Sequence, residues 1–146
     1  MKFVIGNDHG GIDLVDSIKE ALDELGHEYE WVGTFDKSSC DYPDIAKKAC
    51  QKVLDNEADF AILICGTGIG MSISANKINS IRACVVTDTY SAKMAREHNN
   101  SNCLCLGARV LGTELAKMIV KEFANAKFQG DRHQRRIDKI SKLEEN

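Results

Sequence analysis

Short runs rich in β-branched residues alternate with longer amphipathic segments along this chain of 146 residues. Such alternation is typical of strand–helix units that build a parallel sheet covered by helices. Strands are expected at residues 2–6, 30–33, 60–65, 82–87 and 102–106, and helices at 12–25, 43–56, 71–77, 91–98 and 113–126. The pattern predicts an α/β fold, a three-layer Rossmann-like sandwich with a five-stranded parallel sheet.

The helical segments carry start and stop signals. In residues 12–25 apolar side chains recur at three- and four-residue steps, and Gly26 then favours a helix end. Pro43, the only proline, suits a first helical turn. After Gly130, apolar residues at helical spacing predict a C-terminal helical tail that must pack against something: Ile137, Ile140 and Leu143. No repeat or linker interrupts the pattern, so residues 1–146 are expected to form a single domain.

The composition narrows the class of protein. Apolar residues make up 43% and charged residues 28%, values typical of a packed globular domain. The net charge of −3 disfavours nucleic acid as a partner. The longest strongly apolar run, residues 60–65, is far shorter than the ~18 residues of a membrane-spanning helix, so no membrane partner is expected. The N-terminus lacks the pattern of a signal peptide, which favours a cytoplasmic location.

The six cysteines include no C-x-x-C pair and no Cys/His quartet at zinc spacing. Free thiols are therefore expected, and no metal site. Cys84, Cys103 and Cys105 lie in apolar stretches, where a thiol behaves as a small hydrophobe, and are assigned to the core.

Candidate site residues follow the predicted strands, because an open parallel sheet binds ligands beyond the carboxyl ends of its strands. Asp8 and His9 stand after the first strand, beside two glycines that allow a tight turn. A carboxylate and an imidazole side by side are suited to binding or proton transfer. The alternative is that Asp8 caps the following helix and His9 is a surface residue.

The strongest local signal is the loop after the third strand, in which Gly66, Gly68 and Gly70 alternate with Thr67 and Ile69. Its backbone N–H groups are expected to converge on an anion. No Gly-Lys-Ser/Thr follows, and the spacing departs from G-x-G-x-x-G, which disfavours a nucleotide.

Cys65 immediately precedes that loop, whose donors are expected to stabilise its thiolate as a base or nucleophile. The alternatives are that Cys65 is a buried, inert strand cysteine and that Thr67 only caps the next helix.

Further candidates come later in the chain. His98 and Asn99 lie where the fourth predicted helix ends, and His98 is suited to general acid chemistry near neutral pH, although a solvated helix end is the commoner role. Arg109 follows the fifth strand. Arg132 and Arg136 lie four residues apart in the tail, where they would share one helix face and suit one phosphate. A solvated charged face is the alternative.

Taken together, these segments resemble the type B ribose-5-phosphate isomerases and the related galactose-6-phosphate isomerase subunits. The resemblance spans nearly the whole chain. It is carried by Asp8-His9 with Gly11, Asp41-Tyr42-Pro43, the run 64–70, Ala75-Asn76-Lys77, Ile81-Arg82-Ala83, Tyr90-Ser91-Ala92, Arg96-Glu97-His98-Asn99, Gly107-Ala108-Arg109-Val110 and Gly130 with Arg132-His133-Gln134-Arg136.

The resemblance implies an aldose–ketose isomerase that works through an enediolate without metal or organic cofactor. It implies that Cys65 is the base, that Thr67 assists proton movement between the oxygens, and that His98 protonates the ring oxygen to open the furanose. It also implies roles in substrate binding: Asp8 and Asn99 for hydroxyls, the backbone of Gly66, Thr67, Gly68, Ile69 and Gly70 for the developing negative charge, and His9, Arg109, Arg132 and Arg136 for the phosphate.

Some relatives carry a glutamate base directly after the glycine loop, where this chain has Met71, so the resemblance leaves the basic role to Cys65. Family members form homodimers or dimers of dimers with sites completed across the interface. The hypothesis is a ribose-5-phosphate isomerase of the pentose phosphate pathway. The alternatives are an allose- or galactose-6-phosphate isomerase and a non-catalytic sugar-phosphate-binding module.

Overall fold

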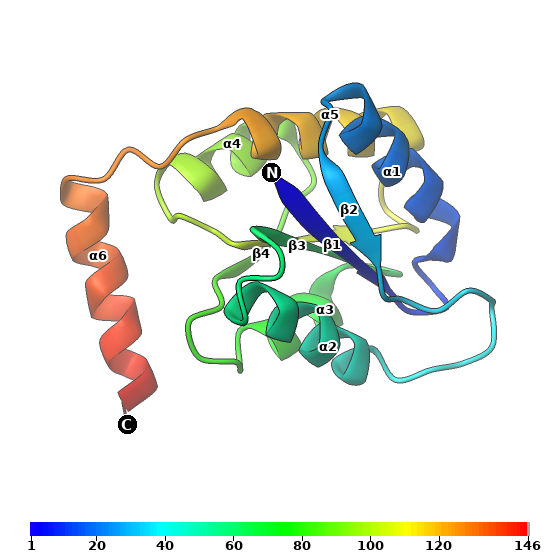
Figure 1. Ribbon diagram of the computed structural model, residues 1–146, viewed down its shortest axis with the longest axis horizontal. Helices are drawn as coiled ribbons and strands as arrows, with labels where there is room; N and C mark the ends of the chain where they lie inside the picture. The colour runs from blue at the N-terminus through cyan, green and yellow to red at the C-terminus, as the bar shows by residue number, and fades with distance from the viewer. Residues whose placement is uncertain (146) are drawn as a thin grey trace.

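A computed structural model describes residues 1–145, so residue 146 of the predicted domain lies outside the described part (Figure 1). The strands are β1 (Lys2–Asn7), β2 (Glu28–Trp31), β3 (Phe60–Cys65), β4 (Ala83–Val85) and β5 (Cys103–Gly107). The α-helices are α1 (Val15–Glu24), α2 (Tyr42–Leu54), α3 (Ile69–Ala75), α4 (Thr89–Glu97), α5 (Thr113–Asn125) and α6 (Arg132–Ser141). Two 3₁₀ turns, η1 (Ile12–Leu14) and η2 (Lys142–Glu145), precede α1 and follow α6.

The five strands form one parallel sheet in the order β2-β1-β3-β5-β4. The strands β1, β3 and β5 are therefore neighbours at its centre, with Asn7 opposite Ile64 and Cys65 opposite Gly107. This register brings the loops that follow the three central strands to one edge of the sheet.

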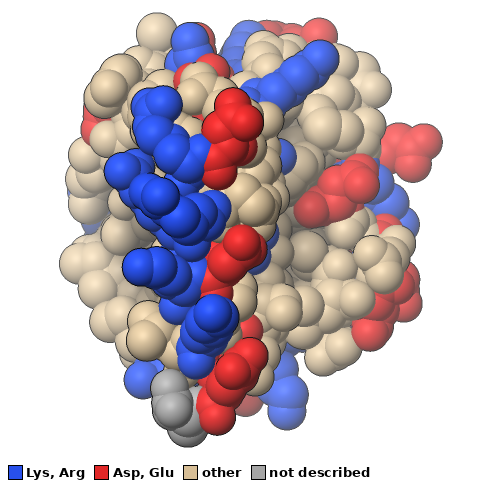
Figure 2. All heavy atoms as spheres, turned by 90° about the vertical axis from the view of Figure 1, so that its left-hand side faces the viewer, with Lys and Arg blue, Asp and Glu red and all other residues tan. Residues whose placement is uncertain are grey.

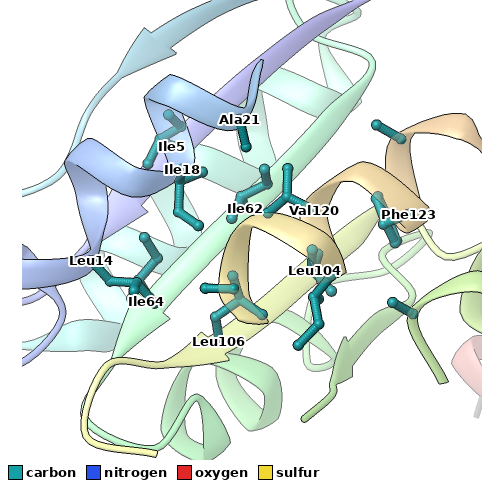
Figure 3. Packing of buried hydrophobic residues seen from close by; sticks show 14 of the residues in the cluster. Ile5, Leu14, Ile18, Ala21, Ile62, Ile64, Leu104, Leu106, Val120 and Phe123 are labelled. Carbon is teal, nitrogen blue, oxygen red and sulfur yellow. The ribbon is translucent and has the colours of Figure 1, made fainter. Parts of the chain in front are cut away.

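The alternation of side chains along the central strands divides the core into two layers. On one face Ile62, Ile64, Leu104 and Leu106 pack against α1, α4 and α5, as Figure 3 shows for α1 and α5. On the other face the intervening residues pack against α2 and α3: Ala61, Leu63, Cys65, Cys103 and Cys105. The predicted three-layer α/β sandwich is confirmed.

Several boundaries differ from those expected. Strand β2 begins at Glu28 because it pairs in register with Lys2 of β1, a choice invisible in the local sequence. Strand β4 is only three residues long and lies at the sheet edge, where it pairs with β5 alone. The placement of Cys84 in the core is wrong in part: this edge residue is half-buried, whereas Cys103 and Cys105 are fully buried. All six cysteines are free.

The predicted C-terminal tail is the helix α6, which stands apart from the other helices in Figure 1. It lies on the side of the molecule away from the loop that follows β2. Only His133 and Ile137 of α6 are buried, while Ile140 remains 43% exposed and the following Leu143 is 71% exposed. Among residues 1–145 no helix is long and apolar enough to cross a membrane.

Candidate active site

The loops after β1, β3 and β5 are tied to one another by backbone hydrogen bonds. The amide of Asp8 donates to the carbonyl of Ile64 (3.1 Å), and the amide of Arg109 donates to the carbonyl of Gly66 (2.9 Å). The Arg109 side chain lies so close to Gly66 that a Cβ built there would stand 2.9 Å from Nη1. Asp8, the glycine loop and Arg109 therefore meet at the carboxyl edge of the sheet.

Asp8 is 6% exposed, and its carboxylate is committed to the local turn. Oδ1 accepts hydrogen bonds from the amides of Gly10 (2.9 Å) and Gly11 (3.1 Å), directly before η1. Asp8 thus supports the turn before η1, whose N-cap is Gly11, so Asp8 is not the helix cap that the alternative expected. One oxygen bonded in this way fixes the carboxylate plane, so that Oδ2 has a defined position from which it can accept a substrate hydroxyl.

His9 lies at the same edge, with its ring oriented by the loop that follows β2. The amide of Cys40 donates to Nδ1 of His9 at 3.3 Å. Because Nδ1 accepts this bond, the neutral ring carries its proton on Nε2. That tautomer presents an N–H donor suited to a phosphate oxygen.

Cys65 ends β3 with its side chain directed into the glycine loop. The amide of Gly68 donates to Cys65 Sγ at 3.1 Å, and the residue is 5% exposed. Gly68 adopts a left-handed φ of +79°, which turns its amide back toward the strand end. Helix α3 then begins at Ile69, two residues earlier than expected. This backbone donor fixes the position of the sulfur at the base of the loop.

Not every amide of the glycine loop points toward a ligand. Gly68 donates to Cys65, and Ile69 donates to Oγ1 of Thr67 at 3.3 Å. Thr67 itself is exposed at the carboxyl edge. The expected ring of donors is therefore smaller in this chain than the five consecutive amides suggested, and two of its members orient the candidate catalytic side chains instead.

A pocket of about 270 Å³ opens at this edge, lined by His9, Gly10, Asp13, Lys37, Ala108 and Arg109. Lys37 and Arg109 against the single carboxylate of Asp13, with an imidazole donor from His9, make it suited to an anion. Lys37 has no role predicted from the sequence; it lies in the loop after β2 and pairs with Asp13 at 3.2 Å. Charge in a loop gives no signal of its own. Tyr42 was also given no role, yet its ring covers Gly70, where a Cβ would stand 2.8 Å from the ring carbons.

The other predicted residues lie elsewhere in the chain. His98 is the C-cap of α4, and a helix between parallel strands ends at their amino edge. Cys103, which opens β5, pairs with Ala61, whereas Gly107 at its other end pairs with Cys65. Four residues of strand, or about 13 Å, thus separate the amino edge from the carboxyl edge. Within one chain, His98 and Asn99 do not face Cys65.

Two arginines hold the segment that follows His98. Arg82 donates to the carbonyls of Asn99 (3.2 Å) and Asn100 (2.9 Å). Arg96 donates to Asn100 Oδ1 (2.9 Å) and to the carbonyl of Ser101 (2.6 Å). Burial lowers the pKa of both guanidinium groups, which still remain charged at neutral pH. His98 and Asn99 are therefore carried by a fixed turn.

Arg132 and Arg136 lie one helical turn apart on α6. His133 of the same helix stacks on His98. Figure 2 shows a column of Lys and Arg side chains on this side of the molecule, flanked by Asp and Glu. Both arginines are exposed, and neither forms an ion pair within residues 1–145. The second group of predicted residues therefore forms a separate surface that includes two exposed arginines: His98, Asn99, Arg132 and Arg136. Among residues 1–145, no group of three or more His, Cys, Asp or Glu side chains is arranged to hold a metal ion.

Comparison with known proteins identifies the family. The profile described as ribose/galactose isomerase matches residues 3–140. The chain is 51% identical over 146 residues to a putative sugar phosphate isomerase of Bacillus subtilis, covering 99% of this chain and 98% of that protein. It is 44% identical over 144 residues to ribose-5-phosphate isomerase B of Escherichia coli, covering 99% and 97%.

The fold agrees as closely as the sequence. A solved structure of ribose-5-phosphate isomerase B from Clostridium thermocellum superposes with a TM-score of 0.96 at 48% identity, covering 99% of this chain and 98% of that chain. The resemblance expected from the motifs is confirmed over the whole length of the domain. The chain therefore belongs to the ribose/galactose isomerase family, and it is an isomerase.

Proposed function

We propose that this isomerase interconverts D-ribose 5-phosphate and D-ribulose 5-phosphate. The observation that carries the proposal is the hydrogen bond from the Gly68 amide to Cys65 Sγ, at a sheet edge shared with His9 and Arg109. A sulfur base and an anion pocket at one edge are the parts needed to move a proton between two carbons of a sugar phosphate. The names of the E. coli and C. thermocellum relatives support the pentose as substrate.

The proton steps of the proposal take the residue roles that the family resemblance implies. His98 protonates the ring oxygen while the proton of the C1 hydroxyl passes to water, which opens the furanose to the aldehyde. The Cys65 thiolate takes the hydrogen from C2, and the electron pair moves onto the carbonyl to form the enediolate. Thr67 passes a proton between O1 and O2, and Cys65 returns its proton to C1, giving the ketose. Amides of the residue 66–70 loop that face the substrate stabilise the enediolate charge.

Phosphate binding draws on both edges of the sheet. His9 and Arg109 line the pocket of about 270 Å³, which is smaller than the roughly 300–1,000 Å³ of ordinary ligand sites. Arg132 and Arg136 supply the forked donors that suit a phosphate, and Asn99 joins Asp8 in binding hydroxyls. In a single chain these residues lie on opposite edges, so one chain cannot surround one substrate.

We therefore assign the complete site to a homodimer, alone or within a dimer of dimers. A cavity of about 700 Å³ separates α6 and η2 from the edge of the sheet, and Ile140 and Leu143 line it. Ile69, Ile73 and Val85 are exposed on α3 and β4. These apolar side chains have what a self-complementary interface requires, and a second copy seated there would bring its α4 and α6 residues to the carboxyl edge of the first.

Mixing two inactive variants tests the shared site. In a dimer of Cys65→Ser with His98→Asn, one site carries both changes and the other carries neither. Co-refolding equal amounts is expected to restore about a quarter of the wild-type rate on ribose 5-phosphate, because half of the dimers are mixed and each has one intact site. No recovery, with mixed dimers verified by mass spectrometry, contradicts the shared site.

Parallel assays test the sugar length. The value of kcat/KM for ribose 5-phosphate is expected to exceed those for allose 6-phosphate and galactose 6-phosphate. A higher value for either hexose phosphate contradicts the proposed substrate but leaves the proton chemistry in place.

A further inference from the structure

His133 and His98 form a stacked pair that none of the roles above uses. Their ring centroids are 4.2 Å apart, and the ring planes differ by 11°. His133 is the second residue of α6 and is 5% exposed, whereas both neighbours, Arg132 and Gln134, are exposed. The stack joins the end of α4 to the start of α6.

The segment before α6 is fastened at the same place. The amide of Gln129 donates to the carbonyl of Glu97 (3.0 Å), and the Gln129 side chain donates to the Glu97 carboxylate (3.0 Å). Glu97 directly precedes His98. The segment that leads into α6 is therefore fixed beside His98, the candidate acid. The His133 ring stacks on the His98 ring.

The surroundings of the His133 ring favour its neutral form. Burial lowers the pKa of His133, and the positive charges of His98, Arg132 and Arg136 lower it further, while Asp131 acts in the opposite direction. Its Nε2 is buried and has no hydrogen-bond partner within residues 1–145. The contact that the ring does make is face to face with His98. An aromatic face of this kind attracts a cation, so a neutral His133 is compatible with a protonated His98.

We propose that His133 is a positioning residue for ring opening: its ring fixes the plane of His98, so that the acid is aimed at the furanose oxygen. Because Arg132 and Arg136 flank His133 on α6, the same helix places the phosphate and the acid together. The inference rests on the proposed function, since it assumes that His98 opens the ring.

The two directions of the reaction separate ring opening from carbon chemistry. Ribose 5-phosphate is predominantly a furanose and must be opened. Ribulose 5-phosphate is an open chain, because its O5 carries the phosphate and cannot close a five-membered ring. Exchange of a C1 hydrogen of ribulose 5-phosphate with deuterated solvent therefore requires the base but no ring opening.

The test compares both rates in His133→Leu, which removes the aromatic plate, and His133→Phe, which keeps it. In His133→Leu, turnover of ribose 5-phosphate is expected to fall about 10- to 100-fold, the cost of a misaligned acid, while C1 exchange stays within about threefold of wild type. His133→Phe is expected to restore most of the turnover.

Ile137→Ala is the matched control, because Ile137 is the other buried residue of α6 and lies one turn further along. It loosens the packing of the helix without touching the stack and should leave the ratio of the two rates unchanged. An equal fall of both rates in His133→Leu, a His133→Phe variant as slow as His133→Leu, or a changed ratio in Ile137→Ala would each overturn the proposal. Absence of C1 exchange in the wild type would instead overturn the proposed function.

Discussion

The two halves of the candidate site are built in different ways. The carboxyl-edge half is held by central strands whose residues are almost all buried, so that Asp8 and Cys65 are fixed by backbone hydrogen bonds. The α4–α6 half depends on one turn held by arginines and on a helix that buries only His133 and Ile137. The carboxyl-edge residues are held together within one chain, whereas the α4–α6 residues would meet them only in the proposed dimer.

The largest effect is expected from a change in the carboxyl-edge half. Cys65→Ser should lower turnover by at least about 10²- to 10⁴-fold, the usual contribution of a general base, because the serine hydroxyl is a far weaker acid than a thiol. The dissociation constant for ribose 5-phosphate, measured by calorimetry, should change little. Cys84→Ser, a thiol change away from the glycine loop, should retain turnover. Near-normal turnover in Cys65→Ser would make this sulfur a bystander.

The second-largest effect is expected from the arginines of α6. Arg136→Ala should raise KM about 10- to 100-fold with kcat nearly unchanged, because a charge-assisted phosphate contact acts on the ground state and the transition state alike. The neighbouring Arg135→Ala is the matched control and should have little effect. A loss confined to kcat in Arg136→Ala contradicts a role in uniform phosphate binding.

The third prediction concerns the conformation of the glycine loop in the carboxyl-edge half. Gly68→Ala should lower the free energy of unfolding by about 1–3 kcal/mol, because a side chain is strained at a left-handed φ. Its Cβ would also stand 2.9 Å from Val85 Cγ2. Turnover should fall as well, since the amide that bonds Cys65 shifts. Gly112→Ala, where nothing lies within 4 Å of the added Cβ, serves as the control in urea unfolding.

The smallest effect is expected far from both halves, at the ion pairs between α1 and α5. Hydrogen bonds from Lys121 and Lys117 hold the pKa of Glu24 below its ordinary value of 4.5. A carboxyl with a lowered pKa stabilises the fold above its unfolded-state pKa and loses that contribution as the pH falls through the folded value. The urea midpoint for unfolding of Glu24→Gln should therefore be slightly lower than that of the wild type at pH 7. The two midpoints should converge below pH 4. An equal difference at both pH values contradicts this linkage.

Much of the carboxyl-edge half could be predicted from the sequence, because its residues lie at or shortly after the ends of strands. Cys65 ends the third predicted strand, and Arg109 lies three residues after the fifth. The carboxyl ends of neighbouring parallel strands share an edge. Lys37 had no predicted role, because its loop has no periodicity to place it. Loop donors were expected at Cys65, but the sequence did not indicate that a left-handed Gly68 would supply one. Contacts of that kind depend on φ values and on packing between distant segments.

The sequence by itself determined the strand–helix alternation, the parallel sheet, the C-terminal helix and the family, because hydrophobic periodicity and local motifs are written in neighbouring residues. Only the tertiary structure decided that the candidate residues form two groups on opposite edges of the sheet. It also placed His133 on His98, a contact between residues 35 positions apart in the chain. The physical reason is that sheet order and helix docking are set by long-range packing, which no local pattern encodes.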